Sequence, residues 1–169
     1  MPHSAKTKPP HKEVKRREKL SDDGLLELVQ RQTFLFFWDS AQPASGLARD
    51  RTGRLTDPRD DIVATGGSGF GVMALIVACE RGWVARANVL ARLSKALDCL
   101  ERATCYHGLY PHFMHGDTGA TKPFSRKDDG ADLVESAFLF QGLLCARAYF
   151  DRDAPEEKRI RDRITYPWS

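Results

Sequence analysis

Two segments of this chain are typical of helices that have almost no polar face. Residues 69–81 contain an unbroken apolar run from Val72 to Cys79, and residues 133–144 carry only three polar side chains. A helix that is apolar all round must be buried on every side. The helical segment between them, about residues 85–103, has one apolar stripe and one charged face. This alternation predicts two layers in which outer helices shield inner ones, as in an α/α toroid of helical hairpins.

The helix boundaries follow from local signals. Ser21 is a good N-cap, with two acidic residues in the first turn behind it. Asp128 or Asp129 caps the fourth helix, and Pro155 suits the first turn of the fifth. An all-α chain is therefore expected, with a short β-hairpin excursion within residues 113–124. The five expected helices cover about residues 21–40, 69–81, 85–103, 128–150 and 156–166, and residues 41–67 form a long polar connection of the kind that often lines a site.

Five helices are too few to close a two-layer ring. The inner helices would lack neighbours on one side and expose apolar surface. Pro167 also breaks the last segment without a capping device. We therefore expect a basic flexible arm over residues 1–20, followed over residues 21–169 by the N-terminal part of a truncated toroid domain.

The net charge of +3 comes largely from the first 20 residues, which hold seven Lys and Arg against two Glu. The remainder is near neutral, so nucleic acid is not an expected partner. The arm has no apolar signal-peptide core, and the longest apolar run is too short to span a membrane, which predicts a cytoplasmic protein without a membrane span. The four cysteines lack metal-ligand spacing, and three of them lie in apolar helical patterns, so they are interpreted as buried hydrophobes.

An acidic motif precedes the second apolar helix. If the helix includes Asp128, then Asp128, Asp132 and Glu135 are at positions i, i+4 and i+7 and share one face. Burial and mutual repulsion raise the pKa of a carboxyl group, whereas the helix N-terminus lowers it. Carboxyl groups under such opposing influences are candidates for acid–base chemistry. For Asp128 and Asp129 a purely structural capping role is equally plausible. For Asp132 and Glu135 function is favoured, because an unpaired carboxylate at a deeper position is costly.

The glycine-rich segment from Thr65 to Gly71 allows two interpretations. It could form a loop that brings a sugar close to backbone amides, with Gly67, Ser68 and Phe70 as candidate binding residues. Alternatively, the glycines let a helix start in close contact with neighbouring backbone, and this second interpretation is slightly favoured. The segment fits neither a nucleotide-binding pattern nor a nucleophile elbow.

The segment from Tyr106 to His115 is rich in aromatic and histidine side chains. Aromatic rings can stack on sugar rings while polar edges form hydrogen bonds, so Tyr110 and His112 are candidate substrate-binding residues, with Asp129 of the acidic motif. His112, His115 and Asp117 are weak evidence for a metal site, and neither a metal nor another cofactor is expected.

Three separated segments, residues 28–39, 65–74 and 127–144, together with Tyr106–Gly108 and Pro111–His112, resemble the bacterial glycoamylase-like family and occur in the same order. The resemblance implies an (α/α)6 barrel that acts on glucans. Characterised relatives are similar to inverting endo-β-1,2-glucanases, some members are described as glucoamylases, and many are exported. It also implies acid–base candidates at Asp128, Asp132 and Glu135, and a further Glu in a later half that this chain lacks.

Three hypotheses therefore stay open. The chain is part of a glucan-hydrolysing glycosidase, a glucan-binding remnant without catalysis, or an inactive gene fragment. Inverting hydrolysis needs two carboxyl groups about 6.5–9.5 Å apart on opposite sides of the scissile bond. Because the acidic motif supplies one side, we expect the chain alone to be inactive. The expected partner is a glucan or gluco-oligosaccharide, with no obligate protein partner.

Overall fold

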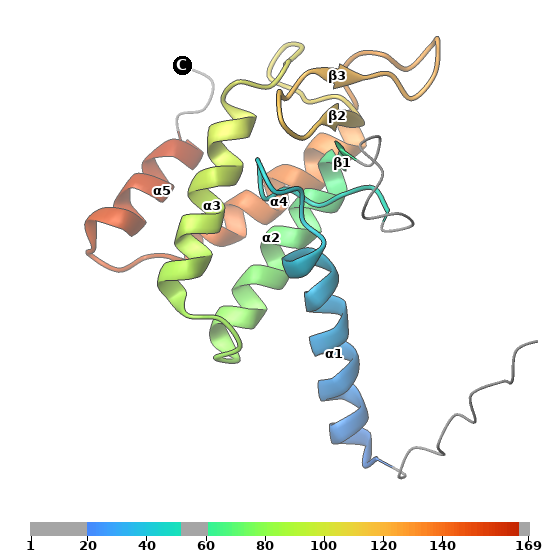
Figure 1. The fold of residues 1–169 in the computed structure, drawn as a ribbon. Coiled ribbons are helices and arrows are strands. Elements are labelled where there is room, and N and C mark those ends of the chain that lie inside the picture. Colours follow the sequence, from blue (N-terminus) through green and yellow to red (C-terminus); the bar gives the residue numbers. More distant parts are fainter. Residues whose placement is uncertain (1–19, 52–60, 166–169) are drawn as a thin grey trace, which may run out of the picture.

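The computed structural model describes residues 20–51 and 61–165, which form five helices and one small sheet (Figure 1). The mostly helical architecture and the hairpin predicted within residues 113–124 are confirmed. The elements in chain order are α1 (Asp22–Asp39), β1 (Ile62–Ala64), α2 (Thr65–Glu80), α3 (Arg86–Leu100), β2 (Phe113–His115), β3 (Thr121–Lys122), α4 (Leu133–Tyr149) and α5 (Pro155–Thr165).

Helices α2 and α4 cross in direct backbone contact at two glycines. A Cβ atom at Gly69 would lie 2.1 Å from the carbonyl oxygen of Phe138, and one at Gly142 would lie 2.3 Å from the carbonyl oxygen of Gly69. No larger residue fits at either position without moving a helix. The close-packing interpretation of the glycine-rich segment therefore describes Gly69 correctly. Helix α3 packs against α2 and α5, and α5 also contacts α4.

The apolar helices α2 and α4 are not buried on every side, so that expectation is wrong for this chain. Phe70 and Val77 on α2 are 54% and 43% exposed, and Val134 and Phe138 on α4 are also exposed. The rings of Phe70 and Phe138 lie 5.1 Å apart, which makes the two exposed faces continuous. The exposed apolar surface expected from five helices is present in the described residues.

The sheet lies at the end of the molecule where α2 and α4 begin (Figure 1). Its strand order is β1-β2-β3, antiparallel throughout, with Val63 opposite Met114 and Phe113 opposite Lys122. β1 was expected to be part of the connection 41–67, of which residues 52–60 lie outside the described residues. A strand of three residues is too short to show an alternating pattern, so only its pairing with β2 defines it.

Two helix starts differ from the sequence expectation. Helix α2 begins at Thr65, so the glycines that were expected to precede it lie inside its first turns. Helix α4 begins at Leu133, with Asp132 as its N-cap, rather than at Asp128 or Asp129. Asp132 stops the helix from extending backward because its extended backbone (φ −115°, ψ 114°) lets its side chain cap the first turn. The predicted N-cap Ser21 and the place of Pro155 in the first turn of α5 are confirmed.

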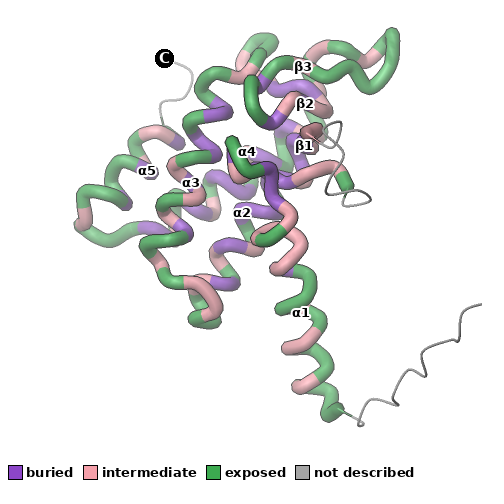
Figure 2. The backbone as a smooth tube through the Cα atoms, viewed as in Figure 1, coloured by how far each residue is buried: buried purple, intermediate pink, exposed green. Residues whose placement is uncertain are grey.

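Helix α1 projects away from the other helices, and only its C-terminal half is substantially covered (Figure 2). Phe34 is buried against the core, whereas Leu25, Leu26 and Val29 nearer the N-terminus are exposed. The predicted basic arm lies almost wholly outside the described residues. Among the residues the structure describes, no helix combines the length and the hydropathy needed to cross a bilayer.

Candidate active site

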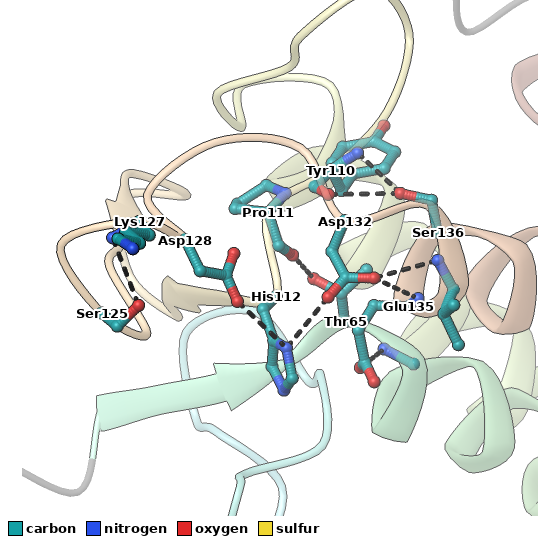
Figure 3. Close-up of polar contacts among 12 residues, drawn as sticks. Thr65, Tyr110, Pro111, His112, Ser125, Lys127, Asp128, Asp132, Glu135 and Ser136 are labelled. Atoms are coloured by element: carbon teal, nitrogen blue, oxygen red, sulfur yellow. Dashed lines mark hydrogen bonds and ion pairs between the residues drawn. The ribbon is translucent and has the colours of Figure 1, made fainter.

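Asp132 occupies the N-terminus of α4, where free backbone N–H groups meet the positive end of the helix dipole. Its Oδ1 accepts hydrogen bonds from the amides of Val134 at 2.9 Å and Glu135 at 3.0 Å. Its other oxygen, Oδ2, lies 3.0 Å from Nδ1 of His112 (Figure 3). The structural capping role and the position in a polar cluster therefore belong to the same side chain.

His112 is held at the entrance to β2 by the start of α2. Thr65 at that start donates its amide to the carbonyl of His112 at 3.1 Å and its hydroxyl to the carbonyl of Pro111 at 2.5 Å. Thr65 is fully buried, so these bonds fix the backbone on which the imidazole stands. The ring itself keeps partial contact with solvent.

Asp128 reaches the same imidazole from a different element. It lies in a tight turn in which its amide donates to Ser125 and its carbonyl accepts from Phe124. Its Oδ2 is 4.0 Å from Nδ1 of His112, and its side chain is 34% exposed. Asp128 is not on α4, so the prediction that three carboxylates share one helix face is wrong. The turn nevertheless brings Asp128 and Asp132 to the same imidazole nitrogen (Figure 3).

Two carboxylates and an imidazole in this arrangement can hold and pass a proton at a surface that a substrate can reach. One ligand atom from each of His112, Asp128 and Asp132 lies within 4.8 Å of the others, and no other such group occurs in residues 20–51 and 61–165. The set of His112, His115 and Asp117 considered from the sequence is thus not a ligand group. A cation could approach these three atoms. In the structure, however, Asp132 and His112 form a 3.0 Å contact with each other, so these two groups already have a partner.

Glu135 has a different role from the two aspartates. Its Oε2 accepts a 2.7 Å hydrogen bond from the amide of Gly66 in the first turn of α2. The N-cap of α2 is Ala64, which has no side chain able to cap. Glu135 therefore supplies from α4 the carboxylate that α2 lacks, and a Cβ at Gly66 would collide with it at 2.7 Å.

Three of the substrate-binding candidates turn out to be interior or helical residues. Tyr110 is only 3% exposed and donates its hydroxyl to the carbonyl of Leu100, so it packs in the core instead of facing a sugar. Ser68 is buried, donating to the carbonyl of Ala64 and accepting from the amide of Ala48. Gly67 lies inside α2 and does not form a loop. The substrate-binding role of these three residues stays a prediction.

Two further candidates remain at the surface, and the sixth, His112, belongs to the cluster already described. Asp129 is exposed in the turn next to Asp128, and Phe70 belongs to the exposed face of α2. The structure adds Phe124, whose ring stacks on His112 with centroids 4.7 Å apart and planes 17° from parallel. The sequence signal that could have identified Phe124 is an isolated aromatic residue in a polar stretch directly before the acidic motif.

Carboxylates beside an exposed aromatic ring are groups that carbohydrate-active proteins use to hydrolyse and to bind sugars. The chain is 45% identical, over 150 residues, to an exo-β-1,2-glucooligosaccharide sophorohydrolase from Parabacteroides distasonis. Crystal structures of a glucoamylase-like protein from Bacteroides uniformis (51% identity) and of an endo-β-1,2-glucanase from Chitinophaga pinensis with sophorotriose and glucose (47%) each superpose with a TM-score of 0.84. The resemblance stated from the sequence is confirmed: the chain's homologues are glucoamylase-like proteins and β-1,2-glucan hydrolases.

The chain covers only part of these relatives. The alignments include 88–90% of this chain but 20% of the sophorohydrolase, 36% of the Bacteroides uniformis protein and 37% of the Chitinophaga pinensis glucanase. No protein-family model matches the chain.

Proposed function

We propose that this chain forms one carboxylate-bearing wall of the active site of a β-1,2-glucan-hydrolysing glycosidase. The observation that carries the proposal is the convergence of Asp128 and Asp132 on His112 at a partly open surface. The substrate class is suggested by the homologues, whose names specify β-1,2-linked glucans and sophoro-oligosaccharides.

The contacts divide the work between the two aspartates. Both oxygens of Asp132 are engaged, one by backbone amides and the other by His112, so Asp132 positions the imidazole. Asp128 is the more exposed of the two and is 4.0 Å from the imidazole, which leaves it free to exchange a proton with a glucosidic oxygen or a water. Inverting hydrolysis needs a second carboxyl about 6.5–9.5 Å away. In this proposal it comes from the part of the relatives' length that the chain does not span.

The finer fold assignment belongs to the same proposal. The five helices are a segment of an (α/α)6 barrel in which α2 and α4 are inner helices. The exposed and continuous apolar faces of these two helices support this assignment, because inner helices of a closed ring would pack those faces against further helices.

A second candidate function is glucan binding without hydrolysis. It is favoured by the fully engaged state of Asp132, since a carboxylate with all its hydrogen bonds made is a poor proton carrier. In this case His112 and the aspartates would bind sugar hydroxyls, and no bond would be cleaved.

The test is turnover of sophorotriose by the complete product of the gene, followed by ion chromatography. Asp128→Asn should lower turnover by about 100-fold or more, because it removes a proton-transferring group. Asp151→Asn makes the same chemical change on an exposed residue at the opposite end of α4 and should leave turnover unchanged. Full activity in Asp128→Asn would overturn the assignment. Binding without cleavage by the wild type would select the second candidate, and neither binding nor cleavage would reject both.

A further inference from the structure

A separate cavity of about 320 Å³ lies beside the carboxylate cluster, on the side of the sheet. Its volume is at the lower end of the range of about 300–1,000 Å³ for small-molecule sites, which suits a single sugar unit. Neither the acid–base proposal nor the residues singled out from the sequence use this cavity. It is lined by Asp50, Arg51, Ile62, Phe113, Lys122, Pro123 and Phe124.

The aromatic wall of the cavity is Phe124. One face of its ring is held against His112, with centroids 4.7 Å apart, and Phe113 supports it at 5.6 Å. The side chain is nevertheless 60% exposed. A flat ring that is braced from behind and open in front is a platform for the C–H face of a pyranose, and little side-chain entropy remains to be lost on binding.

The lining of the cavity also includes three charged residues. Arg51 and Asp50 form a 2.6 Å ion pair, and the amide of Asp50 is fixed by a hydrogen bond to the carbonyl of Ile62 in β1. Lys122 contributes a further donor from β3. A lining that combines donors and acceptors with aromatic side chains matches a neutral polyhydroxy ring, whose edge is polar and whose faces are apolar.

Phe124 and Asp128 belong to the same hydrogen-bonded turn. The amide of Phe124 donates to the carbonyl of Asp128 at 2.8 Å, and the two residues close the same tight turn. A sugar that rests on Phe124 therefore contacts the turn that carries the acid–base candidate, and only the imidazole of His112 separates the ring from Asp132.

We propose that the Phe124 cavity is a glucosyl-binding subsite that holds one sugar of a gluco-oligosaccharide beside the carboxylates. This inference deepens the proposed function and rests on it for the identity of the sugar. The subsite itself requires only binding and does not require cleavage.

The experiment is calorimetric titration of the complete gene product with sophorotriose, in the Asp128→Asn background so that no turnover occurs. Phe124→Ala and Phe124→Leu should weaken binding by about five-fold or more, and Phe124→Trp should retain it. Phe124→Leu still covers His112, so a loss in this variant reports the missing flat ring and not a disturbed imidazole. Leu26→Ala, at an equally exposed position on α1, is the control that should bind as the parent does.

The outcomes separate this inference from the proposed function. Unchanged affinity in both Phe124→Ala and Phe124→Leu, or no binding by the parent, would overturn the subsite even if the wild type hydrolyses glucan. Binding that depends on Phe124 in a protein that never cleaves sophorotriose would support the subsite and reject the proposed catalysis.

Discussion

Asp132 combines two functions in one side chain. Its capping oxygen satisfies two of the amides that an α-helix leaves free, and its second oxygen holds the imidazole of His112. The position of the polar cluster is thus tied to the start of α4. A change at Asp132 therefore affects stability and the site together, and the two effects can be separated by the choice of substitution.

Asp132→Asn should keep the cap, because its amide oxygen can still accept from Val134 and Glu135. Asp132→Ala removes the acceptor and should cost about 1 kcal/mol more in the free energy of unfolding. Urea unfolding followed by circular dichroism measures the difference. Equal stability of the two variants would mean that the cap seen in the structure contributes nothing.

The residues of the site could be predicted better than their arrangement. Asp128, Asp132 and His112 were identified by residue type and clustering, but Asp128 comes close to His112 through a turn and not through helical spacing. Tyr110 could not be placed from its sequence. Its burial depends on Ser136 of α4, which accepts from the amide of Tyr110 and donates to its carbonyl, and this contact joins residues 26 positions apart.

Among the secondary-structure elements, the start of α2 could not be predicted from the local sequence. Composition and periodicity predicted five helices, but the first turn of α2 depends on Glu135 of α4, which is 69 positions from Gly66 in sequence. No sequence pattern around Thr65 indicates that the cap of this helix comes from another helix. The order of the elements was therefore predictable, whereas two of the five helix starts were not.

Helix α5 is attached to α3 through a buried ion pair. Nε and Nη2 of Arg86 donate to the two carboxylate oxygens of Glu157, at 2.7 and 2.9 Å, and Glu157 is almost fully buried. The hydrogen bond from Arg86 is the main reason that the pKa of Glu157 lies below its ordinary value, despite the opposing effect of burial. A bidentate pair of this kind aligns the two helices as well as neutralising the charge.

This ion pair predicts acid sensitivity. Because the pKa of Glu157 is lower in the folded protein than in the unfolded chain, its contribution to stability is present above the ordinary glutamate pKa of about 4.3 and is lost as the pH falls through the lower folded value. Glu157→Gln should therefore flatten the fall in unfolding free energy below about pH 4.3, as measured by urea titrations at several pH values. The exposed Glu156→Gln should keep the wild-type slope. The same slope in Glu157→Gln as in the wild type would contradict this explanation.

The described residues expose a large apolar surface that no other part of them covers. Phe70, Met73 and Val77 of α2 continue into Val134 and Phe138 of α4. The number of expected helices, and the apolar pattern of two of them, predicted this surface. They could not show that aromatic contact between α2 and α4 joins the two faces.

The 169-residue chain should consequently associate with itself as its concentration rises. Val77→Lys places a charge in the exposed apolar surface and should shift the population toward monomer in sedimentation experiments. Asn88→Lys adds the same charge on the exposed side of α3 and should not. A wild-type chain that stays monomeric at every concentration would show that this surface needs no cover.

We expect a gluco-oligosaccharide to bind at the cluster of His112, Asp128 and Asp132. The most direct test is a two-dimensional NMR titration of the labelled chain with sophorotriose. Binding there should shift the amides of Val134 and Glu135, because their hydrogen bonds end on Asp132 of this cluster. Shifts confined to other parts of the chain, or no shifts at all, would rule out binding at this cluster.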